Sequence, residues 1–137
     1  MAWRGLSLLL FATSVFAADP VIGPVTVRPT FVPPNTPTTV TITAQIADTT
    51  LLANGANVQR LNAAGAPAAA LGVMRDDGQG GDAVANDRVF TLTFTVNEPT
   101  PGRAFFRVTG AFPDLNARVP SSSVGVDIGD AAEPLAI

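Results

Sequence analysis

Two stretches of this chain alternate apolar and polar side chains with a period of two, and no other feature restricts the fold so strongly. In residues 38–46 an apolar side chain falls at every second position from Val40 onward, with threonine or glutamine between. Residues 89–96 repeat the arrangement, with Phe90, Leu92 and Phe94 separated by threonines. Successive side chains point to opposite faces of a strand, whereas a helix would spread them around its axis. Both stretches are therefore predicted strands with one buried and one solvated face.

Five further short runs have strand character, at residues 21–27, 57–61, 68–74, 103–109 and 123–128. Turn residues separate these runs, and the twelve prolines and twelve glycines of the chain fit a fold made of short strands. Pro24 assigns the first run to a sheet edge or a bulge. The alanine-rich residues 63–70 are a competing helix, but Gly65 and Pro67 interrupt them. The sequence thus predicts an all-β sandwich or barrel.

The first residues have the pattern of a secretory signal peptide. Arg4 supplies the positive charge, residues 5–16 are mostly apolar, and Val15 and Ala17 place small residues before a cut after position 17. We therefore expect a signal-peptide helix over residues 1–17, which is too short to span a bilayer and is removed on export. The absence of an Arg-Arg pair favours the Sec route. The mature protein is expected in the periplasm, in the medium or on the cell surface, without membrane insertion.

Removal of residues 1–17 from the 137-residue chain leaves 120 residues, enough for one domain. We assign residues 18–129 to that domain and residues 130–137 to a C-terminal tail. Loss of Arg4 changes the formal net charge from −3 to −4, which argues against nucleic acid as a partner. The expected partner is a protein or a surface polymer whose identity the sequence does not give.

Missing residue types exclude most catalytic chemistry. The chain contains no histidine, cysteine, tyrosine or lysine, and its only tryptophan is Trp3 in the signal peptide. A serine nucleophile therefore lacks its usual base, and Schiff-base, thiolate and ordinary zinc chemistry are excluded. A small hydrolase would need Glu98 paired with an aspartate, yet Glu98 lies in a turn before Pro99. We expect a protein that is not an enzyme.

Four aspartates, Asp76, Asp77, Asp82 and Asp87, lie within twelve residues of one another beside several glycines. Carboxylates, together with backbone carbonyls that glycine can turn inward, are the oxygen ligands that Ca²⁺ takes. One interpretation is a structural calcium loop. The alternative is that these residues only form turns, with Arg75 and Arg88 neutralising two of the charges.

The same segment reads MRDDGQGGDAVANDRVFT from Met74 to Thr91. It resembles the Asp-Asp-Gly-x-x-Gly-Asp-x-x-Ala-Gly-Asp-Gly-x-Tyr/Phe-Thr pattern of exported bacterial immunoglobulin-like modules, among them the choice-of-anchor type found beside von Willebrand factor A domains. Asn86 and Arg88 stand where that family usually has glycine. The resemblance covers about residues 20–129. It implies a single immunoglobulin-like antiparallel β-sandwich of about seven strands, acting as a non-catalytic accessory module.

Two surfaces remain candidates for contacts. Phe105 and Phe106 are consecutive, so one of them faces away from the core and is either an exposed contact patch or covered by a loop. The threonine ladder of Thr39, Thr41 and Thr43 is an ordinary solvated sheet face, or a surface for ordered polymers. We expect no regular repeat of this ladder on the neighbouring strands, which favours the solvated face.

Three functions follow from these observations. The sequence favours a non-catalytic secreted or cell-surface module with an adhesion or structural role. The second is a carbohydrate-binding accessory protein, which the absence of tryptophan and tyrosine from the mature chain weakens. A small hydrolase is the third.

Overall fold

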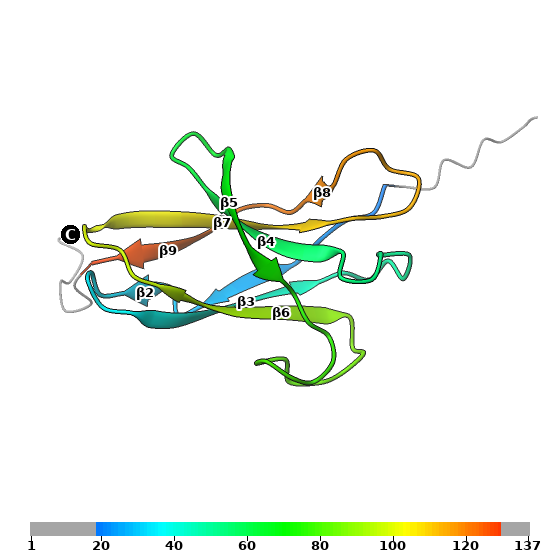
Figure 1. Ribbon diagram of the computed structural model, residues 1–137, viewed down its shortest axis with the longest axis horizontal. Helices are drawn as coiled ribbons and strands as arrows, with labels where there is room; N and C mark the ends of the chain where they lie inside the picture. Colours follow the sequence, from blue (N-terminus) through cyan, green and yellow to red (C-terminus); the bar gives the residue numbers. More distant parts are fainter. Residues whose placement is uncertain (1–18, 130–137) are drawn as a thin grey trace, which may run out of the picture.

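A computed structural model describes residues 19–129, and these residues form two β-sheets and no helix (Figure 1). The first sheet has the order β1-β3-β6, with β1 Val25–Arg28, β3 Thr38–Gln45 and β6 Val89–Val96. The second has the order β2-β9-β7-β4-β5, with β2 Phe31–Val32, β9 Val124–Ile128, β7 Gly102–Gly110, β4 Ala56–Leu61 and β5 Pro67–Val73. A two-residue strand, β8 Val119–Pro120, pairs with β7. The predicted signal peptide and tail lie outside the described residues.

The core lies between the two sheets, where the alternating residues meet. Every residue of β3 has a partner on β6, from Thr38 opposite Val96 to Gln45 opposite Val89. This register places the apolar positions of β3 on the inner face, where they are fully buried. The second sheet supplies the facing apolar layer, made chiefly of Val58, Phe106, Val108 and Val126. Burial of this apolar surface is the main stabilising contribution available to a chain without disulfides.

Each of the seven predicted strands has a counterpart, and only the first differs from its predicted range by more than one residue. The first strand begins at Val25 rather than at residue 21, because Pro24 cannot donate to the ladder. The two-residue strands β2 and β8 had not been predicted, since two residues carry no periodicity. The alanine-rich segment is strand from Pro67 onward, so the competing helix is wrong there. No helix in the described part of the chain could cross a membrane.

The chain crosses between the sheets at the end of β5, and this crossing positions the acidic loop. Arg75 pairs with Thr91 of β6 through two backbone hydrogen bonds, of 2.8 and 2.9 Å. Residues 76–88 then loop back to the start of β6 (Figure 1). The loop packs on the solvent-facing side of the first sheet. Gly81 lies so close to the outward side chain of Thr93 that an added Cβ would come within 2.7 Å of the Thr93 methyl carbon. Thr91 is consequently only 2% exposed.

Candidate functional site: the acidic loop

Three of the four predicted aspartates meet in the folded loop. Carboxylate oxygens of Asp76, Asp82 and Asp87 all lie within 4.8 Å of one another. Asp76 follows the Arg75 bridge, Asp87 precedes β6, and Asp82 comes from the middle of the loop. Residues separated by up to eleven positions thus converge because the loop is closed at its base by the pairing of Arg75 with Thr91.

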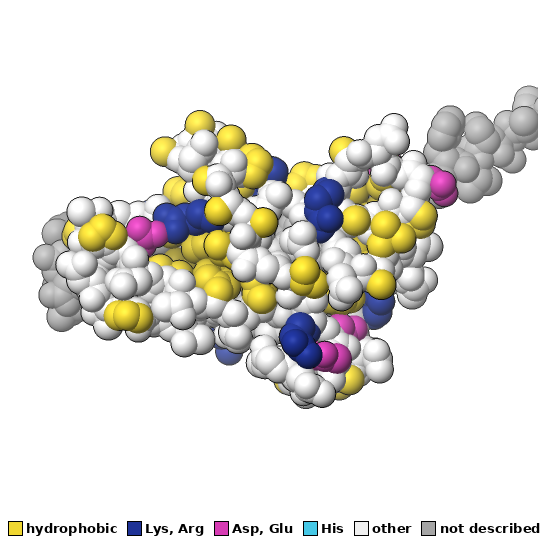
Figure 2. Space-filling view, viewed as in Figure 1, with side chains coloured by type: hydrophobic (Ala, Val, Ile, Leu, Met, Phe, Trp, Pro, Cys, Tyr) yellow, Lys and Arg dark blue, Asp and Glu magenta, His cyan; other side chains and the backbone are white. Residues whose placement is uncertain are grey.

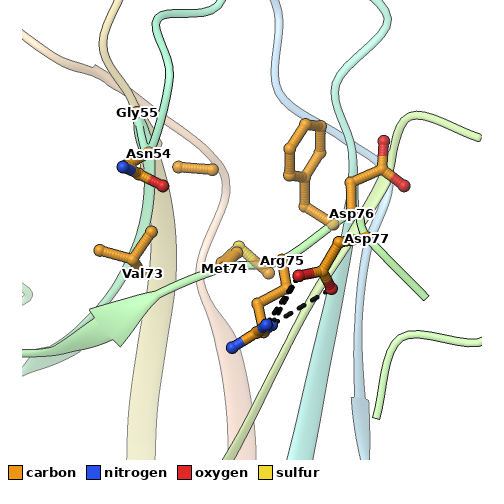
Figure 3. Close-up of a pocket in the computed structure, with 9 residues that line it drawn as sticks. Asn54, Gly55, Val73, Met74, Arg75, Asp76 and Asp77 are labelled. Atoms are coloured by element: carbon orange, nitrogen blue, oxygen red, sulfur yellow. Dashed lines mark hydrogen bonds and ion pairs between the residues drawn. The ribbon is translucent and has the colours of Figure 1, made fainter. Parts of the chain in front are cut away.

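Asp77 does not join this cluster. Its carboxylate accepts hydrogen bonds from the Arg75 guanidinium, with a shortest distance of 2.7 Å, and Figure 3 shows the two side chains turned toward each other. Asp77 also accepts a hydrogen bond from the amide of Gln79 at 3.0 Å. Arg75 therefore neutralises one acid, as the turn interpretation expected, while the other three remain together.

Backbone amides hold the three clustered carboxylates in place. Asp76 accepts hydrogen bonds from the amides of Asp87 at 3.2 Å and Arg88 at 3.0 Å. Asp82 is 6% exposed and accepts one from the amide of Gly78 at 2.8 Å. Asp87 accepts one from the amide of Val89 at 2.9 Å. Each carboxylate is thus oriented by main-chain donors rather than by a cationic side chain.

The pKa of Asp76, in the cluster, and the pKa of the neighbouring Asp77 are shifted in opposite directions. Burial raises the pKa of Asp76 above its ordinary value of 3.8, and the nearby Asp87 carboxyl adds to the rise. The hydrogen bond from Arg75 lowers the pKa of Asp77. A carboxyl whose pKa is raised, as that of Asp76 is, gains stability from a proton or a cation placed beside it. The cluster can therefore accept positive charge, whereas Asp77 already has its counter-charge.

Arg88 occupies a backbone position that suits glycine. Asn86 and Arg88 have φ angles of 61° and 64°, in the left-handed region, at the two positions where the resembling family has glycine. The Arg88 side chain forms no ion pair with an aspartate of the acidic loop, so the turn interpretation was wrong for this residue. Instead it donates to the carbonyls of Ile46 at 3.0 Å and Asp48 at 2.6 Å, and its guanidinium lies 5.2 Å from the Phe90 ring. These contacts offset the strain of the left-handed backbone.

A cleft of about 410 Å³ lies beside the cluster, between the start of β4, the end of β5 and the first residues of the loop. Its walls include Asn54, Gly55, Arg75, Asp76 and Asp77, which Figure 3 shows around the opening. The sequence did not indicate this cleft, because Asn54 and Gly55 lie about twenty residues before the acidic loop and carried no motif.

The donor set of the cluster is made of oxygen alone. Three carboxylates satisfy the charge requirement of a hard divalent cation, and Ca²⁺ completes its shell with carbonyls and water. No sulfur or imidazole ligand is present in the chain, so the set does not suit zinc or copper. Asp76, Asp82 and Asp87 could therefore hold a metal ion through their carboxylate oxygens, a donor set of the kind that Ca²⁺ takes.

Glu98 has a structural partner. It forms an ion pair with Arg60 of β4, and both side chains are about one third exposed. Its backbone carbonyl accepts a hydrogen bond from Asn35 at 2.7 Å. Glu98 thus ties the β6–β7 turn to the second sheet, and no aspartate was found paired with it among the described ion pairs and hydrogen bonds.

The two consecutive phenylalanines face opposite sides of β7, as predicted. Phe106 is 1% exposed in the core. Phe105 lies on the outer face, where the Arg103 guanidinium is 5.5 Å from its ring. It lines a second, smaller hollow of about 260 Å³ with Leu61 and the turn at Ala63 and Ala64. The outward phenylalanine is therefore partly covered by a loop rather than fully exposed.

The threonine face is more regular than the sequence indicated. The register of β3 and β6 sets Thr39 opposite Thr95, Thr41 opposite Thr93 and Thr43 opposite Thr91. The expectation that neighbouring strands lack the repeat was wrong, because strand register cannot be read from two separate stretches of sequence. The acidic loop covers Thr91 and also contacts Thr93, so Thr39 and Thr95 are the pair in which both residues are exposed.

Comparison with known proteins adds little to this description. No known protein family matches the sequence, and no curated protein matches it. Among solved structures the chain is similar to a Pseudomonas fluorescens alkylpurine DNA glycosylase, AlkC, bound to DNA containing an abasic site analog. The TM-score is 0.44 at 12% identity, over 82% of this chain and 31% of that chain. The chain thus spans less than a third of that protein, and a similarity of this size supports no conclusion about function.

Proposed function

We propose that this chain is an exported, non-catalytic immunoglobulin-like module with an adhesion or structural role on or outside the cell. The observation that carries the proposal is the strand order, β1-β3-β6 on one sheet and β2-β9-β7-β4-β5 on the other. In immunoglobulin lettering this order corresponds to A-B-E facing C, F and G, with an added C′ strand beside C and the two-residue β2 paired parallel with G. The acidic loop occupies the place beside strand E where constant-type domains have strand D.

The shape of the described chain supports a modular role. Its first residues lie at one end of the long axis, and Gly129, after β9, lies at the other (Figure 1). A domain with its ends at opposite poles can be joined to neighbours without bending the connections back over the sandwich. Such a unit can hold other parts of a surface structure apart or present them to a partner.

The acidic loop fits this role as a structural calcium site. Mutual repulsion opposes the approach of the Asp76, Asp82 and Asp87 carboxylates, whose oxygens lie within 4.8 Å of one another. A calcium ion would relieve it and would brace the segment that replaces an edge strand. Asp77 belongs to the surrounding turn rather than to the ligand set, because Arg75 engages it.

Export and adhesion are tested together in the source organism. A strain lacking the gene is complemented with the wild-type chain or with a chain lacking residues 1–17, and attachment to surfaces is measured beside cell fractionation. We expect the protein outside the cytoplasm and attachment restored by the wild-type chain alone. Cytoplasmic accumulation of the wild-type protein, or turnover of glycoside or ester substrates by the purified protein, would contradict the proposal.

A carbohydrate-binding accessory role is the second candidate, and the paired threonines favour it. Thr39 lies opposite Thr95 and the half-buried Thr41 lies opposite Thr93, so hydroxyl and methyl groups gather on one sheet face. Sedimentation with insoluble polysaccharides measures this directly. Binding that is lost in Thr41→Lys but kept in a variant of the opposite sheet, such as Arg107→Lys, would support this role over protein adhesion.

A further inference from the structure

The outer face of the second sheet carries arginines on its central strand. The outward positions of β7 are Arg103, Phe105, Arg107 and Thr109, because the residues between them lie in the core. Arg118, in the loop before β8, reaches the same face, since its Nε donates to Thr109 Oγ1 at 2.8 Å. Arg107 and Thr109 are neighbours on this face, about 7 Å apart along the strand. The guanidinium groups of Arg107 and Arg118 are therefore close enough to contact one ligand.

Neutral groups hold both of these guanidiniums in place. Arg107 Nε donates to Gln59 Oε1 of β4 at 2.9 Å. Arg118 donates to Thr109 and to the backbone carbonyl of Gly55. None of the ion pairs found among the described residues includes either arginine. Both side chains are thus oriented while some of their terminal nitrogens have no partner in the described part of the chain, so an anionic group would meet donors that are already in position.

The clustered carboxylates lie on the other side of the sandwich, because the acidic loop packs on the outer face of the first sheet. On the second sheet the ion-paired carboxylate is Asp127, which binds Arg103 at 3.3 Å. Arg103 passes over Gly125 of β9, where an added Cβ would come within 2.5 Å of the Arg103 Nε. The mature chain is acidic as a whole, yet the outer face of the second sheet has an excess of positive charge.

Two projections enclose the middle of this face. The β4–β5 hairpin and the loop before β8 both rise from the same side of the sandwich (Figure 1). Figure 2 shows the surface hollowed between them, with dark blue basic side chains in the hollow. At the hairpin, the smaller hollow of about 260 Å³ is lined by Phe105 together with Leu61 and Ser123. An aromatic ring therefore lies on the same face as the two arginines, two positions along the strand from Arg107.

The strand beneath this face offers no backbone edge. Strand β7 pairs with β4 on one side and with β9 and β8 on the other, so an extended peptide cannot add to it as a further strand. A ligand must be recognised through side chains, namely guanidinium forks, the Gln59 amide and the Phe105 ring. Acidic polysaccharides present matching groups, since carboxylates or sulfates pair with guanidinium forks and the apolar face of a sugar ring packs on an aromatic ring. Charge would supply most of the affinity, so tryptophan and tyrosine are not required.

We propose that the outer face of the second sheet binds a polysaccharide that bears acidic groups. Arg107 and Arg118 pair with these groups, and Phe105 contacts a sugar ring. The inference names a partner for the proposed adhesion role and rests on that role only for the place where the protein meets such a polymer, because the binding itself belongs to the folded domain. The aspartates of the opposite face would repel the same polymer, so the domain would bind it by one side.

Titration calorimetry of the purified mature protein tests the proposal with polygalacturonate, dextran sulfate and neutral dextran as probes. A chelator is included so that calcium cannot bridge an acidic polymer to the acidic loop. We expect an acidic polymer to bind, more weakly as sodium chloride is raised, and dextran not to bind. Arg107→Gln should weaken the binding about tenfold, because a hydrogen bond between charged groups is lost. Arg28→Gln is the matched control, since it removes the same charge from an exposed position on the other sheet and should leave the affinity unchanged.

Gln59→Glu gives a second test that removes no contact. The new carboxylate accepts the same hydrogen bond from Arg107 but supplies the missing counter-charge, so binding should fall as in Arg107→Gln while the melting temperature is kept. Failure of both acidic polymers to bind, dextran that binds as tightly as they do, an equal loss in Arg28→Gln, or unchanged binding in Gln59→Glu would overturn the proposal. Tighter binding of poly-glutamate would overturn it in favour of an acidic peptide. Export and attachment are measured in cells, so a negative result here leaves the proposed function to its own test.

Discussion

Phe94 of β6 and Phe106 of β7 pack across the two sheets with their ring centroids 5.1 Å apart and their planes tilted by 53°. The two rings come from opposite layers, so this contact joins the sheets directly. Aromatic pairs in this arrangement contribute about 0.5–1.5 kcal/mol beyond the area that they bury.

Truncation of these rings should destabilise the sandwich to different degrees. Phe106→Ala is expected to cost about 3–5 kcal/mol, because the side chain is 1% exposed, and Phe94→Ala less, because it is partly exposed. Thr95→Ala on the solvated face should cost less than about 1 kcal/mol. Chemical denaturation measures all three, and the double variant gives the coupling. Equal losses for Phe94→Ala and Thr95→Ala would show that the faces of β6 are assigned incorrectly.

Calcium should raise the melting temperature of the mature protein by several degrees at millimolar concentration, and a chelator should reverse the rise, because binding to the folded state alone adds stability. Asp82→Asn and Asp87→Asn are expected to abolish the response. Asp77→Asn is the matched control and should keep it, since Asp77 is engaged by Arg75. If sodium chloride at equal ionic strength stabilises as well as calcium does, the acids only repel one another and bind no ion.

The raised pKa of Asp76 gives the calcium-free protein a defined pH dependence. The folded state holds the Asp76 proton more tightly than the unfolded state, so this contribution to stability is complete below pH 3.8 and is lost as pH rises through the folded-state pKa. Asp77, with a lowered pKa, contributes in the opposite direction. The slope of stability against pH should therefore become more positive above pH 3.8 in Asp76→Asn. An unchanged slope would mean that Asp76 is not protonated more readily in the folded protein.

Two substitutions distinguish the effect of the left-handed backbone at Arg88 on stability from the effect of its side-chain contacts. Arg88→Ala and Arg88→Gly both remove the hydrogen bonds to Ile46 and Asp48, but only glycine adopts a φ of 64° without strain. We expect both variants to be less stable than the wild type, with the glycine variant more stable than the alanine variant by about 1 kcal/mol. Thermal melts of the two variants side by side provide the measurement.

Cleavage of the signal peptide is expected after Ala17, or after Ala18 as the second choice. Intact mass spectrometry of the exported protein distinguishes these two sites. Exported protein that retains Met1 would contradict the assignment of residues 1–17.

The alternation of residues 38–46 and 89–96 was sufficient to predict two strands and the side of each that faces the core. Only a strand places every second side chain on the same face. It was not sufficient to predict that Thr41 would lie opposite Thr93, which depends on register. The acidic loop shows the same limit. Its composition indicated four ligands, but the sequence does not show that Arg75 forms an ion pair with Asp77, which leaves three aspartates in the cluster. The role of Arg88 depended on carbonyls about forty residues earlier in the sequence, which no local motif reveals.

The position of the first described residues has a practical consequence. The 137-residue chain has no lysine, so its amino terminus is its only primary amine. The described chain begins at one pole of the long axis, away from Gly129 at the other (Figure 1). In a chain cut after Ala17 or Ala18 this amine would lie at or next to Asp19, so amine coupling to a sensor surface would attach every molecule by the same pole. The acidic loop would stay free, so that calcium binding can be titrated on one uniformly oriented layer.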